Sequence, residues 1–453
     1  MSASDETVEK AGTTSVADQA PGRGPEQAPP RRTRGSVASG QETPPERRRR
    51  VRAGLVALVL AAVGGVLAVL TRPEAVTFAL SDQVADERLP DIVLPARPVA
   101  VALAAYAVVV AVAHVLRGVR GRWAGVVWAL FGVALVVAFL CWAAAGTTFP
   151  LTNQLQGTLN LSTPLILGAL AGVLCERAGV INIAIEGQFL AGAFTAAVVT
   201  TVTGSFLAGT LGAVLAGVLI AALLAVFAIR YYVNQVILGV VLVVFASGIT
   251  GFLFDQFVQD DAAAYNDPGV LPTVPIPVLA DIPIVGATLF DQTPLVYAMY
   301  AAVAVVTYVL FKTRWGLRVR AVGEHPRAAE TVGVNVLRVR YQAVLAGGVV
   351  AGLGGAFFTI GFTGSFDKDL TAGQGFIALA ALIMGRWHPL GATLAALFFG
   401  FTQQLQSQLQ IIATPIPGEL LIMAPYLATV VAVAGLVGRV RPPKADGEPY
   451  VTS

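Results

Sequence analysis

The chain has 453 residues, of which 56% are hydrophobic and only 13% are charged, and its mean hydropathy is +0.73. Soluble globular domains carry about 25% charged residues, so this composition excludes an ordinary soluble domain and predicts an all-α, polytopic integral membrane protein. The formal net charge of +3 says little by itself, because the distribution of charge between loops decides how a membrane protein is oriented.

Residues 1–52 differ from the rest of the chain, since they are rich in Pro, Ser, Thr, Gly, Glu and Arg and almost lack large apolar side chains. Such a segment buries too little surface to offset its ordering entropy, and we expect a disordered cytoplasmic tail. The first apolar run begins near Ala53 without a following cleavage site, which predicts an uncleaved anchor. Arginines directly precede this run, and they indicate a positive-inside topology signal, with a nucleic-acid patch as the alternative.

A membrane-spanning helix needs about twenty mostly apolar residues. Along the chain this pattern predicts about ten to twelve spanning or half-spanning helices, some of them edged by Trp, Tyr or Arg as interfacial anchors. The candidate segments are 53–70, 98–116, 123–145, 158–175, 181–202, 206–229, 235–254, 294–311, 341–360, 372–385, 390–409 and 419–437.

Two long connections set the orientation. The connection 255–291 carries six aspartates and no lysine or arginine, whereas 312–340 carries seven basic residues against only Glu324 and Glu330. Basic loops stay on the cytoplasmic side, so the first connection is expected outside and the second inside. This scheme places both termini in the cytoplasm, including a C-terminal tail at 439–453.

The basic connection contains the charged stretch GEHPRAAETVGVN, residues 323–335. Pro326 suits the first helical position, because its missing N–H would be unpaired there in any case, and Gly333 suits the left-handed position that ends a helix. The sequence therefore predicts a helix of about two turns. Because so short a helix is marginal in water, we expect it to be held in place and presented to a partner; a solvated loop is the alternative.

Three stretches together carry a resemblance to a known family: GLRVRAVGEHPRAAETVGVNV, TPLILGALAGVLCERAGVINIAIEGQFLAGAF and GFIALAALIMGRWHPLGATLAALFFG. Together they closely resemble permease subunits of bacterial ABC importers of the simple-sugar and nucleoside class, most of all the nucleoside permeases that work with basic-membrane-type lipoproteins. The resemblance covers about 151–438, a permease core, and leaves 53–146 as extra N-terminal transmembrane helices.

The resemblance implies a multi-pass subunit of the bacterial cytoplasmic membrane. Its partners would be two cytoplasmic ATPase subunits, a second permease subunit or a second copy, an external substrate-binding lipoprotein, the small solute and membrane lipid, with no nucleic acid. The loop 312–340 would hold the coupling helix that contacts the ATPase. Carried over to this sequence, the contact residues would be Glu324, Pro326, Arg327, Ala328, Ala329, Glu330 and Gly333.

The chain offers no catalytic constellation of its own. A P-loop needs G-x-x-x-x-G-K-[S/T], and no Gly-Lys pair occurs anywhere in the sequence. ATP and Mg²⁺ are therefore expected on the partner ATPase, with no cofactor, metal or catalytic residue on this chain. The three histidines lack the context of a metal or hydrolase motif.

Two interruptions of the apolar pattern suggest a solute pathway. CERAGVINIAIEGQ, at 175–188, places Asn182 and Glu186 four residues apart, and GRWHP, at 385–389, breaks the pattern again. Interrupted segments in two halves are typical of repeat-built transporters with a site at the repeat interface. Polar groups in an apolar zone face a cavity or a partner, so these two residues are candidates for the pathway, with a structural polar clamp as the alternative.

Further candidates for the pathway are Phe358, Phe362 and Phe366, which recur at helical spacing and could stack on a base, and Asn160. Simple packing is the alternative for the phenylalanines. The glutamine run at 401–410 is expected to face protein or water rather than lipid.

The predicted function is the permease subunit of an ATP-driven nucleoside importer. A simple-sugar permease is the alternative within the class. An ion-coupled secondary transporter, with Glu186 titrating, and a membrane-embedded enzyme are the alternatives outside it.

Overall fold

The computed structural model describes residues 44–80, 89–119, 121–412, 414, 416–417, 419–420, 423 and 441–451. The chain divides into two compact units, 1–49 and 50–453. The described residues of the first unit, 44–49, belong to the start of helix α1, Pro44–Leu70. The expectation of a disordered tail up to residue 52 is therefore wrong for 44–52, where Pro44 suits a helix start and arginines favour helix. Residues 1–43 lie outside the described residues.

The N-terminal part of the second unit consists of α1, α2 (Ala96–Leu116) and α3 (Ala124–Ala143). Small residues bring these helices together, since Ala57, Ala61 and Ala107 are buried in one cluster. The sequence pattern did not reveal three short strands. Strand β1 (Ala75–Ala79) follows α1, β2 (Ile92–Pro95) precedes α2, and β3 (Thr148–Pro150) follows α3. Strand β1 pairs antiparallel with β2 and parallel with β3.

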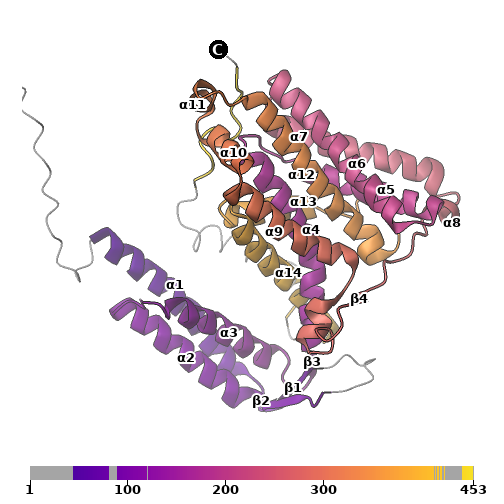
Figure 1. The fold of residues 1–453 in the computed structure, drawn as a ribbon. Helices are drawn as coiled ribbons and strands as arrows, with labels where there is room; N and C mark the ends of the chain where they lie inside the picture. The colour runs from indigo at the N-terminus through magenta and orange to yellow at the C-terminus, as the bar shows by residue number, and fades with distance from the viewer. Residues whose placement is uncertain are drawn as a thin grey trace, which may run out of the picture. The chain divides into compact units, whose positions relative to one another are not determined.

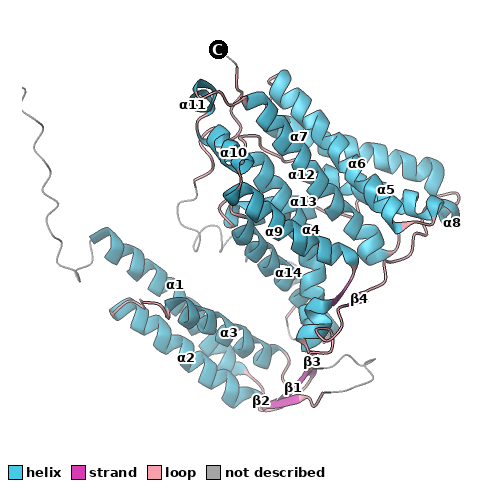
Figure 2. Ribbon diagram, in the orientation of Figure 1, coloured by secondary structure: helices cyan, strands magenta, loops and turns pink. Residues whose placement is uncertain are grey.

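The rest of the second unit is a bundle of helices, shown in Figure 1 and, by secondary structure, in Figure 2. Its helices are α4 (Leu151–Glu176), α5 (Ile185–Thr203), α6 (Phe206–Ala225), α7 (Gln235–Leu253), α8 (Ala262–Tyr265), α9 (Pro294–Lys312), α10 (Arg314–Glu324), α11 (Pro326–Thr331), α12 (Val336–Phe358), α13 (Gln374–Met384) and α14 (Pro389–Ile411).

Several of these helices continue or are flanked by π-helical turns, namely η1 (Val226–Arg230), η2 (Phe254–Val258), η3 (Gly286–Phe290) and η4 (Thr359–Thr363). The two-residue strands β4 (Val274–Pro275) and β5 (Asp291–Gln292) pair antiparallel between α8 and α9.

Nine helices of the described part of the chain are long and apolar enough to cross a membrane. The shorter α13 has 11 residues, about 16 Å of helix, which is half of a hydrocarbon core of about 30 Å. Helix α14 carries the glutamine run. The prediction of an all-α, polytopic membrane protein with spanning and half-spanning helices is confirmed, and the predicted span 419–437 lies almost entirely outside the described residues.

Helices α4 and α12 form the centre of the bundle. The most apolar windows of these helices are 83% and 72% buried inside the protein, against 28% for α2, α3, α7 and α9. Both contribute many residues to the largest buried cluster, including Leu165 and Leu170 from α4 and Ala343 from α12. The helices with low burial present Val, Leu and Ile side chains outward, as lipid-facing helices do.

Glycines let α12 lie directly against α6. A Cβ atom on Gly352 would come within 2.5 Å of the Ala213 carbonyl oxygen, and one on Gly217 within 2.5 Å of the Gly348 carbonyl oxygen. Small residues at a membrane helix interface allow backbones to approach, and packing is a main source of helix association there.

We therefore expect Gly352→Val to push α12 from α6 and to destabilise the protein by about 1–3 kcal/mol. The measurement is the thermal stability of the detergent-solubilised protein. Gly248→Val is the matched control, because nothing lies within 4 Å of the Cβ position at Gly248. Equal melting temperatures for the two variants would contradict the close approach of the two backbones.

Candidate functional site

The coupling loop between α9 and α12 folds into two short helices, α10 and α11. Thr313 caps α10 by accepting a hydrogen bond from the Gly316 N–H at 3.1 Å, and Asn335 caps α12 by accepting from the Arg338 N–H at 2.9 Å. The predicted short helix is present: Pro326 is its first residue, and Gly333 has a φ of +81° after its end. Helix α10, by contrast, was not predicted.

The residues expected to contact an ATPase do not all face outward. Glu324, Arg327, Ala328 and Gly333 are exposed, whereas Pro326 and Glu330 are half-buried. Ala329 is only 4% exposed, and it packs into the core cluster that holds Val319 and Val336. The Ala329 side chain therefore anchors α11 to the bundle, and its place in an ATPase contact stays a prediction.

The carboxylate of Glu186 closes the N-terminus of α13. Its oxygens accept hydrogen bonds from the Thr371 hydroxyl at 2.6 Å, the Gly373 N–H at 2.8 Å and the Gly375 N–H at 2.5 Å. The first N–H groups of a helix have no partner within the helix, and an anion at this end also interacts favourably with the helix dipole. Glu186 is only 7% exposed, so this carboxylate satisfies a buried helix end.

Asn182 is fully buried in the turn between α4 and α5. Its amide donates to the Gln188 side-chain oxygen at 3.2 Å and lies 3.6 Å from the Cys175 sulfur. The contacts of Asn182 and Glu186 are thus contacts to protein, as in the polar clamp that the sequence left open as an alternative.

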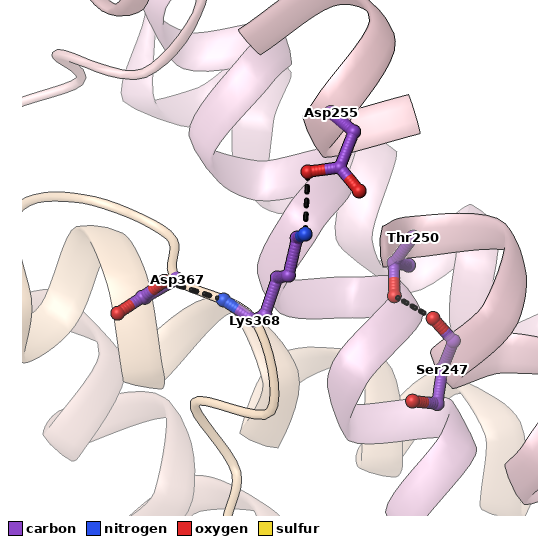
Figure 3. Close-up of polar contacts among 5 residues, drawn as sticks. All are labelled: Ser247, Thr250, Asp255, Asp367 and Lys368. Atoms are coloured by element: carbon purple, nitrogen blue, oxygen red, sulfur yellow. Dashed lines mark hydrogen bonds and ion pairs between the residues drawn. The ribbon is translucent and has the colours of Figure 1, made fainter. Parts of the chain in front are cut away.

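The loop 364–373, which leads into α13, also contacts the C-terminal end of α7 and the turn η2 that follows it (Figure 3). The Lys368 ammonium pairs with Asp255 of η2. The backbone N–H of Lys368 donates to the Asp367 carboxylate at 2.7 Å. Nearby, the Ser247 hydroxyl donates to Asp369 at 3.0 Å. Exposed ion pairs stabilise a protein by at most about 1 kcal/mol, so this end of the loop is held much less firmly than its buried end at Glu186.

The three candidate phenylalanines do not form one helical stripe. Phe358 ends α12 and lies 5.5 Å from the Phe189 ring, whereas Phe362 is exposed in η4. Gly364, with a φ of +76°, then ends the helix. Phe366 lies beyond that end, 2% exposed, with Phe194 5.2 Å from its ring. The expected helical spacing is therefore broken at Gly364, although Phe358 still packs against the buried cluster that contains Phe366, while Phe362 is exposed.

The remaining candidates lie on α4 and α14. Asn160 is half-buried on α4. In the glutamine run of α14, the Gln404 amide donates to the Asn153 carbonyl at 3.4 Å and the Gln403 amide to the Gln374 side chain at 3.4 Å. These glutamines face protein, as the sequence led us to expect.

A buried charge cluster at the end of α4 escaped the sequence reasoning, which used Glu176 and Arg177 only as topology signals. The Trp387 indole N–H donates to Glu176 at 2.5 Å, and the Arg177 side chain donates to the Trp387 carbonyl at 2.8 Å. Burial and the charge of Arg177 lower the pKa of His388, and its imidazole stacks on Phe311. The sequence signal that could have revealed this cluster is the pair Glu176 and Arg177, which follows a long apolar segment.

The sequence matches a family model described as branched-chain amino acid transport system / permease component, over residues 154–438. This chain belongs to that family of transport permeases. The matched region contains the coupling loop, the Glu186 clamp and the glutamine run, and it leaves α1 to α3 outside.

Among the relatives, the guanosine ABC transporter permease protein NupQ of Bacillus subtilis is 40% identical over 303 residues, which cover 65% of this chain and 95% of NupQ. The nucleoside ABC transporter permease protein NupC of Lactococcus lactis is 39% identical over 308 residues, 65% of this chain and 95% of NupC. The putative glucose ABC transporter permease protein TsgC13 of Haloferax volcanii is 35% identical over 260 residues, 56% of this chain and 77% of that protein. The resemblance to ABC permeases is confirmed.

We expect Glu186→Ala to leave the N–H groups of half-buried Gly373 and buried Gly375 unpaired, which would destabilise the permease by at least about 2 kcal/mol. Thr371→Val, which removes only one of the three donors, should have an effect of about 1 kcal/mol. Melting temperatures of the solubilised variants measure both effects, and Glu186→Gln, which keeps one acceptor oxygen, should melt between Glu186→Ala and the wild type. A Glu186→Ala variant with the melting temperature of the wild type would contradict the role of Glu186 as a structural clamp.

Proposed function

We propose that this chain is the transmembrane permease subunit of an ATP-binding cassette importer that moves nucleosides across the cytoplasmic membrane. The observation that carries the proposal is that relatives named for guanosine and nucleoside transport align along 95% of their own length, whereas the relative named for glucose is less similar. A separate ATPase would bind ATP and Mg²⁺, and a second permease subunit and an external lipoprotein would complete the importer.

The coupling loop supports this division of labour. Helix α11 presents Arg327 and Ala328 outward while Ala329 fixes it to the core, which is the arrangement required of a helix that transmits a push from a partner. In the proposed topology this loop and both termini lie in the cytoplasm, because the loop is rich in basic residues.

A continuous set of contacts could carry such a push toward the solute pathway. The end of α10 lies directly on the α4–α5 turn, where a Cβ on Gly323 would be 2.2 Å from the Arg177 carbonyl oxygen. The turn leads into α5, whose Glu186 holds the N-terminus of α13. The loop 364–373 then continues to the exposed Lys368–Asp255 pair. We propose that alternating access uses these elements, with the buried end at Glu186 as a pivot and the exposed pair as the part that opens.

The rival proposal of an ion-coupled transporter needs a carboxylate that gains and loses a proton or cation. The Glu186 oxygens already accept three hydrogen bonds from protein groups. This geometry supports a structural role for Glu186 rather than an ion site. Asn160 and the half-buried Phe358 stay candidates for lining the pathway.

The test of the function is radiolabelled nucleoside uptake in cells with and without the gene, with pull-down of the solubilised protein from its native membrane. We expect loss of guanosine uptake in the deletion strain and co-purification of an ATPase subunit. Glucose uptake lost in place of nucleoside uptake would favour the sugar permease. Uptake that collapses with the proton gradient, without an ATPase in the pull-down, would overturn the proposal.

The coupling surface is tested by Arg327→Glu, which reverses an exposed charge on α11 without entering the core. We expect uptake to fall at least about tenfold, equivalent to about 1.4 kcal/mol, while membrane insertion is unchanged. Arg122→Glu provides the matched control, because Arg122 is also exposed and basic but lies outside the family match. Unchanged uptake by Arg327→Glu would remove α11 from the ATPase contact.

A further inference from the structure

The C-terminal segment, residues 441–451, lies across the coupling loop, as its yellow trace beside α10 and α11 shows in Figure 1. It contacts three elements in succession. The Ala445 N–H donates to the Gly323 carbonyl of α10 at 2.9 Å, and Arg340 of α12 donates to the Glu448 carbonyl at 3.0 Å. The Tyr450 hydroxyl donates to the carboxylate of Glu330 on α11. The segment therefore bridges both helices of the coupling loop and the central helix α12.

Apolar side chains anchor the segment at both ends. Ala445 is 3% exposed and Tyr450 is 5% exposed, and Tyr450 belongs to the same buried cluster as Ala329. A buried tyrosine contributes a large apolar ring and usually finds a partner for its hydroxyl. Here the ring enters the core beneath α11 while the hydroxyl binds α11 itself, so one side chain fixes the helix to the bundle.

The bundle is shaped and charged to receive this segment. Gly179, with a φ of +84°, leaves room for it, since a Cβ there would be 2.8 Å from the Ala445 carbonyl oxygen. The guanidinium of Arg340 is 2% exposed, and its centre lies 5.9 Å from the centre of the Tyr450 ring. A buried charge is costly unless it is paired. The segment supplies the neighbouring charges of Asp446 and Glu448, so its removal would leave Arg340 uncompensated.

The outer edge of the segment continues the surface of α11. Lys444 and Glu448 line a cavity of about 570 Å³ together with Pro326 and Arg327, and the Lys444 ammonium lies 3.4 Å from the His325 ring nitrogen. A subunit that covers the exposed face of α11 would therefore also reach the C-terminal segment.

We propose that the C-terminal segment is a strap that holds the coupling helix α11 in position, with Tyr450 as the positioning residue, so that coupling of the ATPase to transport requires it. The inference rests on the proposed function in that α11 is taken as the contact of the ATPase. The strap transmits force in two directions, since it ties α11 to α12 through Arg340 and to α10 through Gly323.

The test compares solute uptake and ATP hydrolysis by the complete importer in membrane vesicles. Tyr450→Ala and a chain that stops after Pro442 should lose uptake at least about tenfold while the ATP hydrolysed per solute rises. Tyr450→Phe, which keeps the ring and loses the hydroxyl, should lie between them and the wild type. A chain that stops after Tyr450 is the matched control and should behave as the wild type. Normal uptake and a normal ratio of ATP hydrolysed to solute transported in the chain that stops after Pro442 would contradict the proposed role of the C-terminal segment.

A second measurement needs neither solute nor ATPase, and so it separates failure of the strap from failure of the proposed function. Cysteines placed at Lys444 and His325, in a chain with Cys141 and Cys175 replaced by alanine, should be joined by a short bifunctional thiol reagent. Cysteines at Lys444 and Leu317, an exposed residue of α10, give the background yield. A Lys444–His325 yield at that background would overturn the docking of the segment, whatever the importer carries.

The pH dependence of this cross-link gives a further readout. Burial raises the pKa of Asp446 from 3.8 to about 7, although its hydrogen bond to Glu176 of α4 and the charge of Arg340 of α12 partly offset burial. Lys444 and Glu448 are the charged groups beside it on its own segment. A group with a raised pKa favours the docked state below its ordinary value and loses this contribution as pH rises through the raised value. Yield should therefore fall progressively as pH rises from about 4 to about 7, and Asp446→Asn should reduce that fall; an identical profile in both would contradict it.

Discussion

The structure depends on the pairing of Glu186 with the N-terminus of α13. A helix that begins inside an apolar bundle exposes backbone N–H groups that neither lipid nor apolar side chains can satisfy. One carboxylate meets this need with three hydrogen bonds, and in doing so it joins the start of α5 to the start of α13. Without such an acceptor the interrupted helix would be unstable, and the loop 364–373 would have no fixed point on the bundle.

The polar contacts of the bundle differ between its two ends, being buried near the coupling loop and exposed at the C-terminal end of α7. Near the coupling loop, the α4–α5 turn, the Trp387 turn and the C-terminal segment share buried polar contacts, among them Trp387 with Glu176 and Arg340 with Glu448. At the C-terminal end of α7, the polar contacts are exposed, as in the Lys368–Asp255 ion pair. Buried charge-assisted contacts are costly to break, whereas exposed pairs exchange readily with water. This asymmetry suits a transporter that must open on one side at a time.

Much of this organisation could be predicted from the sequence. Hydropathy located the spanning helices, and Pro326 and Gly333 fixed the ends of α11, because each has one dominant local role. The half-length of α13 followed from a short apolar segment. Local pattern could not show that Ala329 faces inward or that the helix ends at Gly364, before Phe366, since both depend on tertiary packing. The partners of Glu186 are 185 to 189 residues away in the chain, a distance at which sequence spacing carries no information.

The position of Tyr450 has a practical consequence for handling this protein. A tag or fluorescent protein fused after residue 453 would be tethered a short way along the chain from a side chain that is buried under α11. Its bulk would occupy the space beside the exposed face of that helix, where Lys444 and Arg327 line the same cavity. Purification handles are therefore better placed elsewhere than directly after the C-terminal segment.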